Sequence, residues 1–266
     1  MNYWDQKTFC LITGASRGLG RTIAIEFAKN VGSGSVFLLV ARSADALEST
    51  KKSIEDETAG KCQVVTAPMD LGTPDKNAIQ EIIKSALATT NSTAADFQHS
   101  LLVHNAGSLG IEKQLKVIEL DDLSDIHSYF SFNVYSMIIL TTQFFKIFND
   151  SEKQRSIVQI TSLGGVQPFK TWGLYCAGKA ARDMLMKSVA EESGIQVISW
   201  APGPVQTDMY DQAVQQTGDK ELQTLFSENQ QQGSVLTAQQ TIIKLIKVLR
   251  EGKYVKGEHV DYYDIE

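Results

Sequence analysis

The 266-residue chain has a formal net charge of −6 at pH 7 and a pI near 5.3, so nucleic acid and an anionic membrane surface are not expected as partners. Its 42% hydrophobic residues suit a globular core, and no apolar run approaches the ~18 residues of a membrane helix. The start of the chain lacks a secretory signal pattern, the three cysteines lie far apart, and the four histidines have no metal-ligand spacing. We therefore expect a cytoplasmic protein without a metal.

A short apolar strand is predicted over residues 8–13, and a glycine-rich turn and a helical pattern over residues 21–30 follow it. The glycine spacing is Gly-x-x-x-Gly-x-Gly, which differs from the common Gly-x-Gly-x-x-Gly fingerprint. A plain flexible loop is the alternative, but the position between strand and helix favours a phosphate-binding turn for a dinucleotide. The residues expected to bind the cofactor here are Gly14, Ser16, Arg17, Gly18, Leu19 and Gly20.

The second predicted strand, residues 35–41, ends in Arg42 and Ser43 where a ribose-binding acid is expected in NAD enzymes. An arginine there can pair with a 2′-phosphate, and Arg17 in the glycine turn could flank the same group. This pattern favours NADPH over NADH. The alternative is that Arg42 is a solvated charge at the end of a strand.

The rest of the chain alternates between strand and helix patterns. Further strands are expected over residues 62–67, 100–104, 156–161, 195–201 and, in the tail, 257–264. Helices are expected over residues 44–58, 75–88, 120–149, 172–188 and 236–250. The alternation predicts an α/β fold: one Rossmann-type domain over residues 1–266, with a doubly wound parallel sheet and helices on both faces.

Polar and special residues follow the predicted strands. They are Gly14, Arg42, Asp70, Asn105, Ser162 and Pro202. Because ligands bind beyond the carboxyl ends of the strands in such sheets, we expect these residues to meet at one edge.

Tyr175 and Lys179 lie four residues apart in a helical stretch, so they share one helix face. An ammonium beside a phenol favours the phenolate and lowers the pKa of the tyrosine, which suits proton transfer to a carbonyl oxygen. The alternative is a surface helix with an unrelated Tyr and Lys.

Residues 205–233 hold eight Gln, and their composition predicts polar helices and loop. This segment could be a lid over the substrate or a solvated helical segment.

These motifs together resemble the short-chain dehydrogenase/reductase family over nearly the whole chain. The motifs are Thr13-Gly14-Ala15-Ser16-Arg17-Gly18-Leu19-Gly20, Asn105-Ala106-Gly107, Ser162 and Tyr175-x-x-x-Lys179. The resemblance implies a catalytic group of Ser162, Tyr175, Lys179 and Asn133, with Asn133 supporting a proton relay to Lys179. It also implies cofactor contacts from Asp70, Leu71, Asn105, Ala106, Gly107, Tyr175, Lys179, Pro202, Gly203 and Val205. His104, where many relatives have Asn, departs from the pattern.

The resemblance is greatest to members that reduce pterin side-chain carbonyls with NADPH on the route to tetrahydrobiopterin. It implies a homodimer built on the helices over residues 120–149 and 172–188. It also implies that the substrate contacts Ser162, Tyr175 and Asp261, whose carboxylate would accept the amino group and ring N–H of the pterin. The alternative for Asp261 is an exposed tail acid.

Two other functions stay open at this point: a reductase of another ketone or dicarbonyl, and a protein that binds NADP(H) as a signal without turnover. The second usually lacks the Tyr or the Lys, and this chain has both Tyr175 and Lys179.

Overall fold

The computed structural model describes residues 3–110 and 115–265. Its central sheet has seven parallel strands in the order β3-β2-β1-β4-β5-β6-β7 among the described residues. The strands are β1 (Thr8–Thr13), β2 (Ser35–Ala41), β3 (Cys62–Pro68), β4 (His99–His104), β5 (Gln154–Ile160), β6 (Gln196–Ala201) and β7 (His259–Asp261). Strands β1 and β4 lie next to each other, with β2 and β3 beyond β1 and with β5, β6 and β7 beyond β4. This order confirms the predicted doubly wound parallel sheet.

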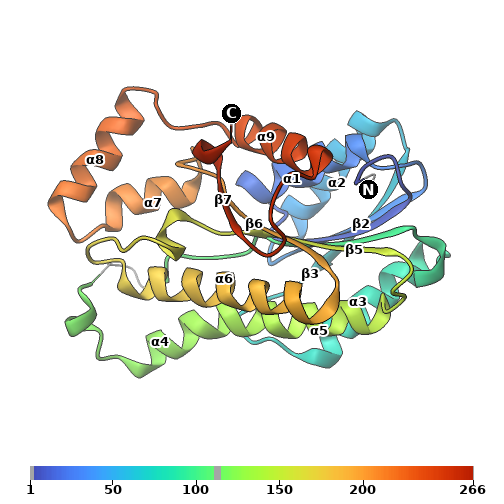
Figure 1. The fold of residues 1–266 in the computed structure, drawn as a ribbon, viewed down its shortest axis with the longest axis horizontal. Coiled ribbons are helices and arrows are strands. Elements are labelled where there is room, and N and C mark those ends of the chain that lie inside the picture. Colours follow the sequence, from blue (N-terminus) through green and yellow to red (C-terminus); the bar gives the residue numbers. More distant parts are fainter. Residues whose placement is uncertain (1–2, 111–114, 266) are drawn as a thin grey trace.

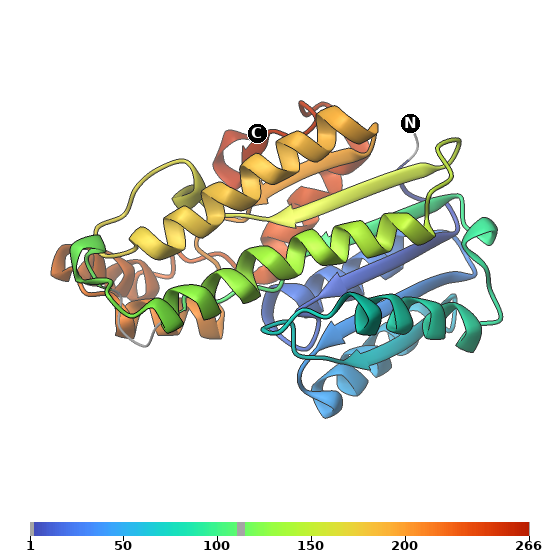
Figure 2. The same cartoon turned by 90° about the horizontal axis from the view of Figure 1, so that it is seen from below.

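Helices cover both faces of this sheet (Figures 1 and 2). One face packs against α1 (Gly18–Asn30), α2 (Ala44–Thr58) and α9 (Ala238–Glu251), and the other against α3 (Lys76–Thr89), α5 (Ser136–Ile147) and α6 (Gly173–Ser193). Alternate residues of β1 enter the two cores, since Cys10 and Ile12 face α1 and α9 whereas Phe9 and Leu11 face α5. Strands buried on both faces explain the continuous apolar runs in the sequence.

The predicted helix over residues 120–149 is divided in the structure. It consists of α4 (Leu123–Phe130), a π-helical turn η3 (Ser131–Tyr135) and α5. A π-helical turn changes the direction of the side chains that follow, and such turns occur frequently at functional sites. Sequence periodicity does not reveal it, because the apolar pattern continues through the turn.

Residues 208–231 form two helices, α7 (Asp208–Gln216) and α8 (Lys220–Gln231), which lie beyond the carboxyl edge of the sheet (Figure 1). The predicted polar helices in this segment are thus confirmed. The last strand is shorter than expected, since β7 pairs with β6 over three residue pairs only. Within residues 3–110 and 115–265, no helix is long and apolar enough to cross a membrane.

Candidate active site

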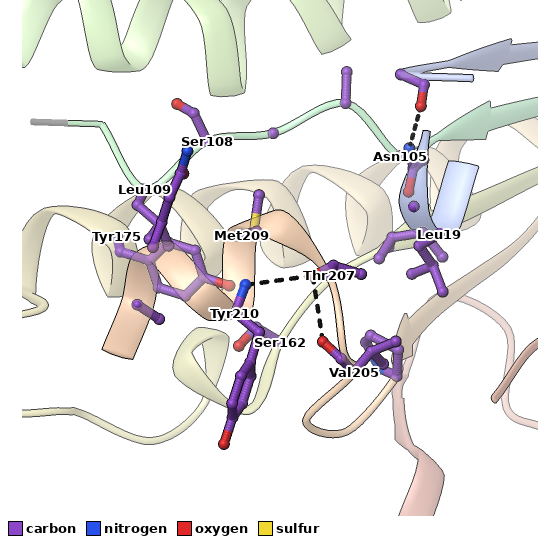
Figure 3. Close-up of a pocket in the computed structure, with 18 of the residues that line it drawn as sticks. Leu19, Asn105, Ser108, Leu109, Ser162, Tyr175, Val205, Thr207, Met209 and Tyr210 are labelled. Carbon is purple, nitrogen blue, oxygen red and sulfur yellow. Dashed lines mark hydrogen bonds between the residues drawn. The ribbon is translucent and has the colours of Figure 1, made fainter. Parts of the chain in front are cut away.

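The carboxyl edge of the sheet opens into one large cavity of about 1620 Å³. Its lining runs from the glycine turn after β1 to α7, α8 and the tail after β7. The strand-end residues that the sequence predicted at one edge all line this cavity: Gly14, Arg42, Asp70, Asn105, Ser162 and Pro202. Figure 3 shows Leu19 and Asn105 at one end of the pocket and Tyr175 with Ser162 at the other.

The glycine turn is packed so closely that Gly14 and Gly20 have no room for a side chain. A Cβ on Gly20 would lie 2.2 Å from the carbonyl oxygen of Gly14, and Gly14 itself has a φ of +67°. The amide of Asn105 donates hydrogen bonds of 2.9 and 3.2 Å to the carbonyls of Thr13 and Gly14, which ties the turn to the end of β4. The backbone of the turn is therefore fixed at the floor of the cavity.

The amino terminus of α1 is left without a side-chain cap. Its N-cap residue, Arg17, makes no capping hydrogen bond, and its first turn holds no acidic residue. By contrast, α2 is capped by Ser43 and α3 by Asp75. Free N–H groups and a positive helix end beside a close-packed glycine turn fit the pyrophosphate of a dinucleotide.

The next part of the cavity holds the residues expected around the adenosine. Arg42 and Ser43 follow β2, and the Ser43 hydroxyl accepts the N–H of Ala46 as the cap of α2. Asp70 is exposed, and Leu71 is buried at the end of β3. Arg42 is exposed and lines the cavity with them.

Arg17, expected to flank the 2′-phosphate with Arg42, has an acidic partner in the structure. Its guanidinium forms a 2.7 Å ion pair with Asp208 at the start of α7. The sequence offered no signal for this pair, because the two residues are 191 positions apart. Arg17 and Arg42 line the same cavity, and the expectation that both flank one phosphate stays a prediction.

Ser162 and Tyr175 lie together at the other end of the cavity. Ser162 lies two residues after β5 and, as the N-cap of the 3₁₀ turn η4 (Leu163–Gly165), accepts the N–H of Gly164. The ring of Tyr175 on α6 packs against Gly164, where a Cβ would lie 3.1 Å from the ring. The close approach of η4 to α6 sets the serine hydroxyl beside the phenol.

Burial raises the pKa of the Tyr175 phenol, and a hydrogen bond with Ser162 acts in the opposite direction. The lowering of this pKa by Lys179 that the sequence suggested is not met here. The Lys179 Nζ lies 5.6 Å from the centre of the Tyr175 ring and donates a 3.0 Å hydrogen bond to the carbonyl of Ile160. A protonated phenol is the form that can give a proton to a carbonyl oxygen.

The Lys179 ammonium is buried, which lowers its pKa to about 7; Arg182 acts in the same direction and Asp183 in the opposite one. A lysine with a pKa near neutrality can change its protonation state under ordinary conditions. Arg182 is itself buried and donates to the carbonyls of His104, Ala106 and Asn133. It thereby joins α6 to the loop after β4 and to η3.

Asn133 lies in the π-helical turn, and its side chain points to the same loop. Its Oδ1 accepts the N–H of Ser108 at 2.9 Å, and its Nδ2 donates to the carbonyl of Tyr129 at 3.0 Å. A Cβ on Gly107 would lie 3.4 Å from Asn133 Oδ1 and 4.0 Å from Lys179 Nζ. The structure thus brings Asn133 and Lys179 close to the same side of Gly107.

Aromatic and apolar side chains form the wall beyond Tyr175. The Trp172 ring meets Tyr175 edge-on at 5.1 Å and Phe226 of α8 at 5.7 Å, and Leu109, Met209 and Ala213 join this cluster. These residues were not predicted from the sequence to line the site. The spacing of Trp172 and Tyr175, three residues apart on one helix, was an available signal for the first of them.

Asp261 ends β7 and lines the cavity with Tyr175 and Ser162. Its Oδ1 accepts the N–H of Tyr263 at 3.0 Å, so it also caps the short 3₁₀ turn η5 (Tyr262–Asp264). A carboxylate has about four acceptor positions, so this contact leaves it able to accept further donors. Val205 and Gly203 line the cavity between the two ends.

No group of three or more potential metal ligands occurs within residues 3–110 and 115–265. The donor set of the cavity is thus one of backbone N–H groups, hydroxyls and single charged side chains. This set fits a nicotinamide dinucleotide, whose phosphates need N–H donors and whose ribose and base need polar groups along the strand ends.

Comparison with known proteins gives concordant results. The family model described as short chain dehydrogenase matches residues 8–218. Sepiapterin reductase of Rattus norvegicus is 38% identical over 258 residues, which cover 96% of this chain and 96% of that protein. Sepiapterin reductase of Xenopus laevis is 36% identical over 260 residues, which cover 97% of this chain and 96% of that protein. The crystal structure of levodione reductase superposes with a TM-score of 0.78 at 22% identity, covering 96% of both chains.

Proposed function

This chain belongs to the short chain dehydrogenase family, and we propose that it reduces the side-chain carbonyl of pterins such as sepiapterin with NADPH, on the route to tetrahydrobiopterin. As a family member it is an oxidoreductase that acts between a hydroxyl and a carbonyl group with a nicotinamide cofactor. The pterin substrate, the preference for NADPH and the cytosol as its place of action are the proposal.

The cofactor, when bound, supplies the hydride. The residues of this chain handle the proton and the charge that grows on the carbonyl oxygen. Tyr175, kept protonated by burial, donates its proton to that oxygen, and the Ser162 hydroxyl beside it donates a hydrogen bond to the same atom. Lys179, with a pKa near 7 and close to Asn133 beside Gly107, is suited to pass a replacement proton toward the phenol.

The preference for NADPH rests on Arg42. No acidic residue takes its place at the end of β2, and its exposed guanidinium lines the cavity where the ribose would lie. A guanidinium pairs with a phosphate in a two-pronged geometry that a neutral ribose hydroxyl cannot reproduce. Arg17 lines the same cavity and its exposed guanidinium pairs with Asp208, so Arg42 is the residue on which the preference is tested.

One observation carries the pterin assignment: the Asp261 carboxylate shares one cavity with the Tyr175 phenol and the Ser162 hydroxyl. A pterin has an amino group and a ring N–H on one edge and the reactive carbonyl on a side chain at the far end. A carboxylate and a proton donor in the same cavity match these two features. The aromatic wall of Trp172 and Phe226 suits the flat ring between them.

The same wall also favours a second candidate, a reductase of aryl ketones or diketones, which need the apolar wall but not the carboxylate.

The homodimer belongs to the proposal as well. Apolar side chains stay exposed on the helices expected to build it, namely Leu123, Tyr135, Ile138 and Met184.

The test is the oxidation of NADPH with sepiapterin or with a small diketone, in the wild type and in Asp261→Ala. Loss of the carboxylate leaves two pterin donors unpaired, at about 1.5–3 kcal/mol, so the KM for sepiapterin should rise about ten- to a hundredfold. The diketone, which has no such edge, should be reduced as before. Equal losses for both substrates would mean that Asp261 serves the fold, and equal activity of both enzymes would remove it from the site.

A further inference from the structure

A buried carboxylate that the chemistry above does not use lies on α6, about two turns after Tyr175. The side chain of Asp183 is only 7% exposed and is held from two sides. Its Oδ1 accepts the amide of Gln159 on β5 at 2.6 Å, and its Oδ2 lies 3.0 Å from Nδ1 of His259 on β7. Burying a charge costs free energy unless hydrogen-bond partners compensate for it. Moving Asp183 away from these two partners would therefore be unfavourable.

Three elements of the active site meet at this carboxylate. Asp183 itself is on the helix that carries Tyr175. The turn that follows Ser162 also passes beside it, since a Cβ on Gly165 would lie 2.6 Å from Asp183 Oδ2. His259 lies two residues before Asp261 on β7. One side chain therefore contacts the segments that bear the serine, the phenol and the tail carboxylate.

The contact with β7 matters because that strand is weakly held by its backbone. β7 lies at the edge of the sheet and pairs with β6 at only three positions, the last of which is Ala201 with Asp261 (Figure 1). A second link between β7 and α6 is the ion pair of Lys187 with Glu258, but its side chains are 39% and 48% exposed. An exposed pair contributes little to stability, whereas the His259 contact is buried, with 11% of the His259 side chain exposed.

We propose that Asp183 and His259 are positioning residues that hold β7 on the catalytic helix and so keep the Asp261 carboxylate at the substrate end of the cavity. This inference rests on the proposed function, in which Asp261 binds the pterin. The pair acts on substrate binding through the position of Asp261.

Three variants separate this role from general stability. His259→Leu removes the donor and leaves Asp183 with Gln159 alone. His259→Asn keeps an N–H donor near the place of Nδ1 and should restore the contact. Glu258→Gln breaks the neighbouring exposed ion pair between the same two elements and is the matched control. Each variant is assayed for the KM and kcat with sepiapterin and with a small diketone, and for amide hydrogen exchange in residues 257–264 by mass spectrometry.

In His259→Leu we expect the KM for sepiapterin to rise about tenfold, kcat to change less than about threefold, and the diketone kinetics to stay near wild type. Amide exchange in residues 257–264 should become at least about tenfold faster, as expected for local opening of an edge strand. His259→Asn and Glu258→Gln should both stay within about threefold of wild type in every measurement.

The proposal is overturned if exchange in residues 257–264 is unchanged in His259→Leu, or if His259→Asn is as impaired as His259→Leu. It is also overturned if Asp261→Ala raises the KM for sepiapterin and His259→Leu does not. A different result contradicts the proposed function: Asp261→Ala leaves the KM for sepiapterin unchanged. In that case faster exchange in His259→Leu shows that the pair holds β7 without serving a pterin, which overturns the link to substrate binding.

Discussion

The two ends of the cavity are built differently. At the cofactor end, α1 begins at a glycine turn pressed against β4 and buries Gly20, Ile23, Ala24, Phe27 and Ala28. At the substrate end, none of the residues of α8, all of which the structure describes, is fully buried. The first end is fixed by backbone contacts within the sheet. The second is held by ring contacts and side-chain hydrogen bonds, such as that of the Tyr210 hydroxyl to the carbonyl of Phe226. Its helices α7 and α8 lie outside the sheet (Figure 1).

The two ends should therefore differ in how well they tolerate amino-acid substitutions. Because the backbone is closely packed at the cofactor end, an atom added to one residue displaces the whole turn. The substrate end can exchange side chains with little cost to the fold, because function in such folds is carried by loops placed on a rigid scaffold. Tyr175 belongs to the substrate end and, in the proposed reaction, lies at the junction of cofactor and substrate.

The largest effect is expected at this junction. Tyr175→Phe keeps the ring and its contacts with Trp172 but removes the proton donor. Turnover should fall by about a hundredfold or more, while NADPH binds as in the wild type. Steady-state turnover and a fluorescence titration with NADPH measure the two quantities. Near-normal turnover would remove Tyr175 from the chemistry.

The next effect tests the rigidity of the cofactor end. In Gly20→Ala the new Cβ would lie 2.2 Å from the Gly14 carbonyl oxygen, so the turn must shift. Overpacking typically costs about 1–3 kcal/mol, and we expect the Kd for NADPH to rise by about thirtyfold. Leu225→Ala, on an exposed residue of α8, is the control and should leave this Kd unchanged. Similar effects of the two variants would show that the two ends do not differ in rigidity.

A smaller and more selective effect is expected for Arg42→Ala. Loss of the guanidinium should weaken NADPH binding by about tenfold and leave NADH binding almost unchanged, because NADH has no 2′-phosphate. Titration with each cofactor gives the comparison directly. Equal weakening of both would show that Arg42 does not distinguish them.

The smallest effect is expected where the two ends touch. Arg17 and Asp208 form an ion pair between the glycine turn and α7, with side chains 68% and 62% exposed. Because exposed ion pairs contribute little, Asp208→Ala should change the KM for sepiapterin and for NADPH by at most about threefold. A tenfold change in either constant would instead make this pair a functional link between the ends.

The sequence predicted the sheet strands to within two residues at most ends, because each strand is an apolar run closed by a polar or special residue. The polar or special residues that follow the strands also predicted which residues meet at the carboxyl edge, from Gly14 to Pro202. It did not predict the π-helical turn that holds Asn133, because apolar residues are frequent on both sides of that turn and an ordinary helical spacing can be drawn through it. It also could not reveal that Arg17 pairs with Asp208.

The amino-acid sequence alone determined the parallel sheet, the glycine turn and the shared helix face of Tyr175 and Lys179. These features depend on local periods and short spacings, which the order of residues contains. Only the tertiary structure decided the direction of the Tyr175 pKa, the pairing of Arg17, and the contact of Asp183 with His259. Burial and contacts between distant segments arise only when the chain is packed, so no local pattern records them.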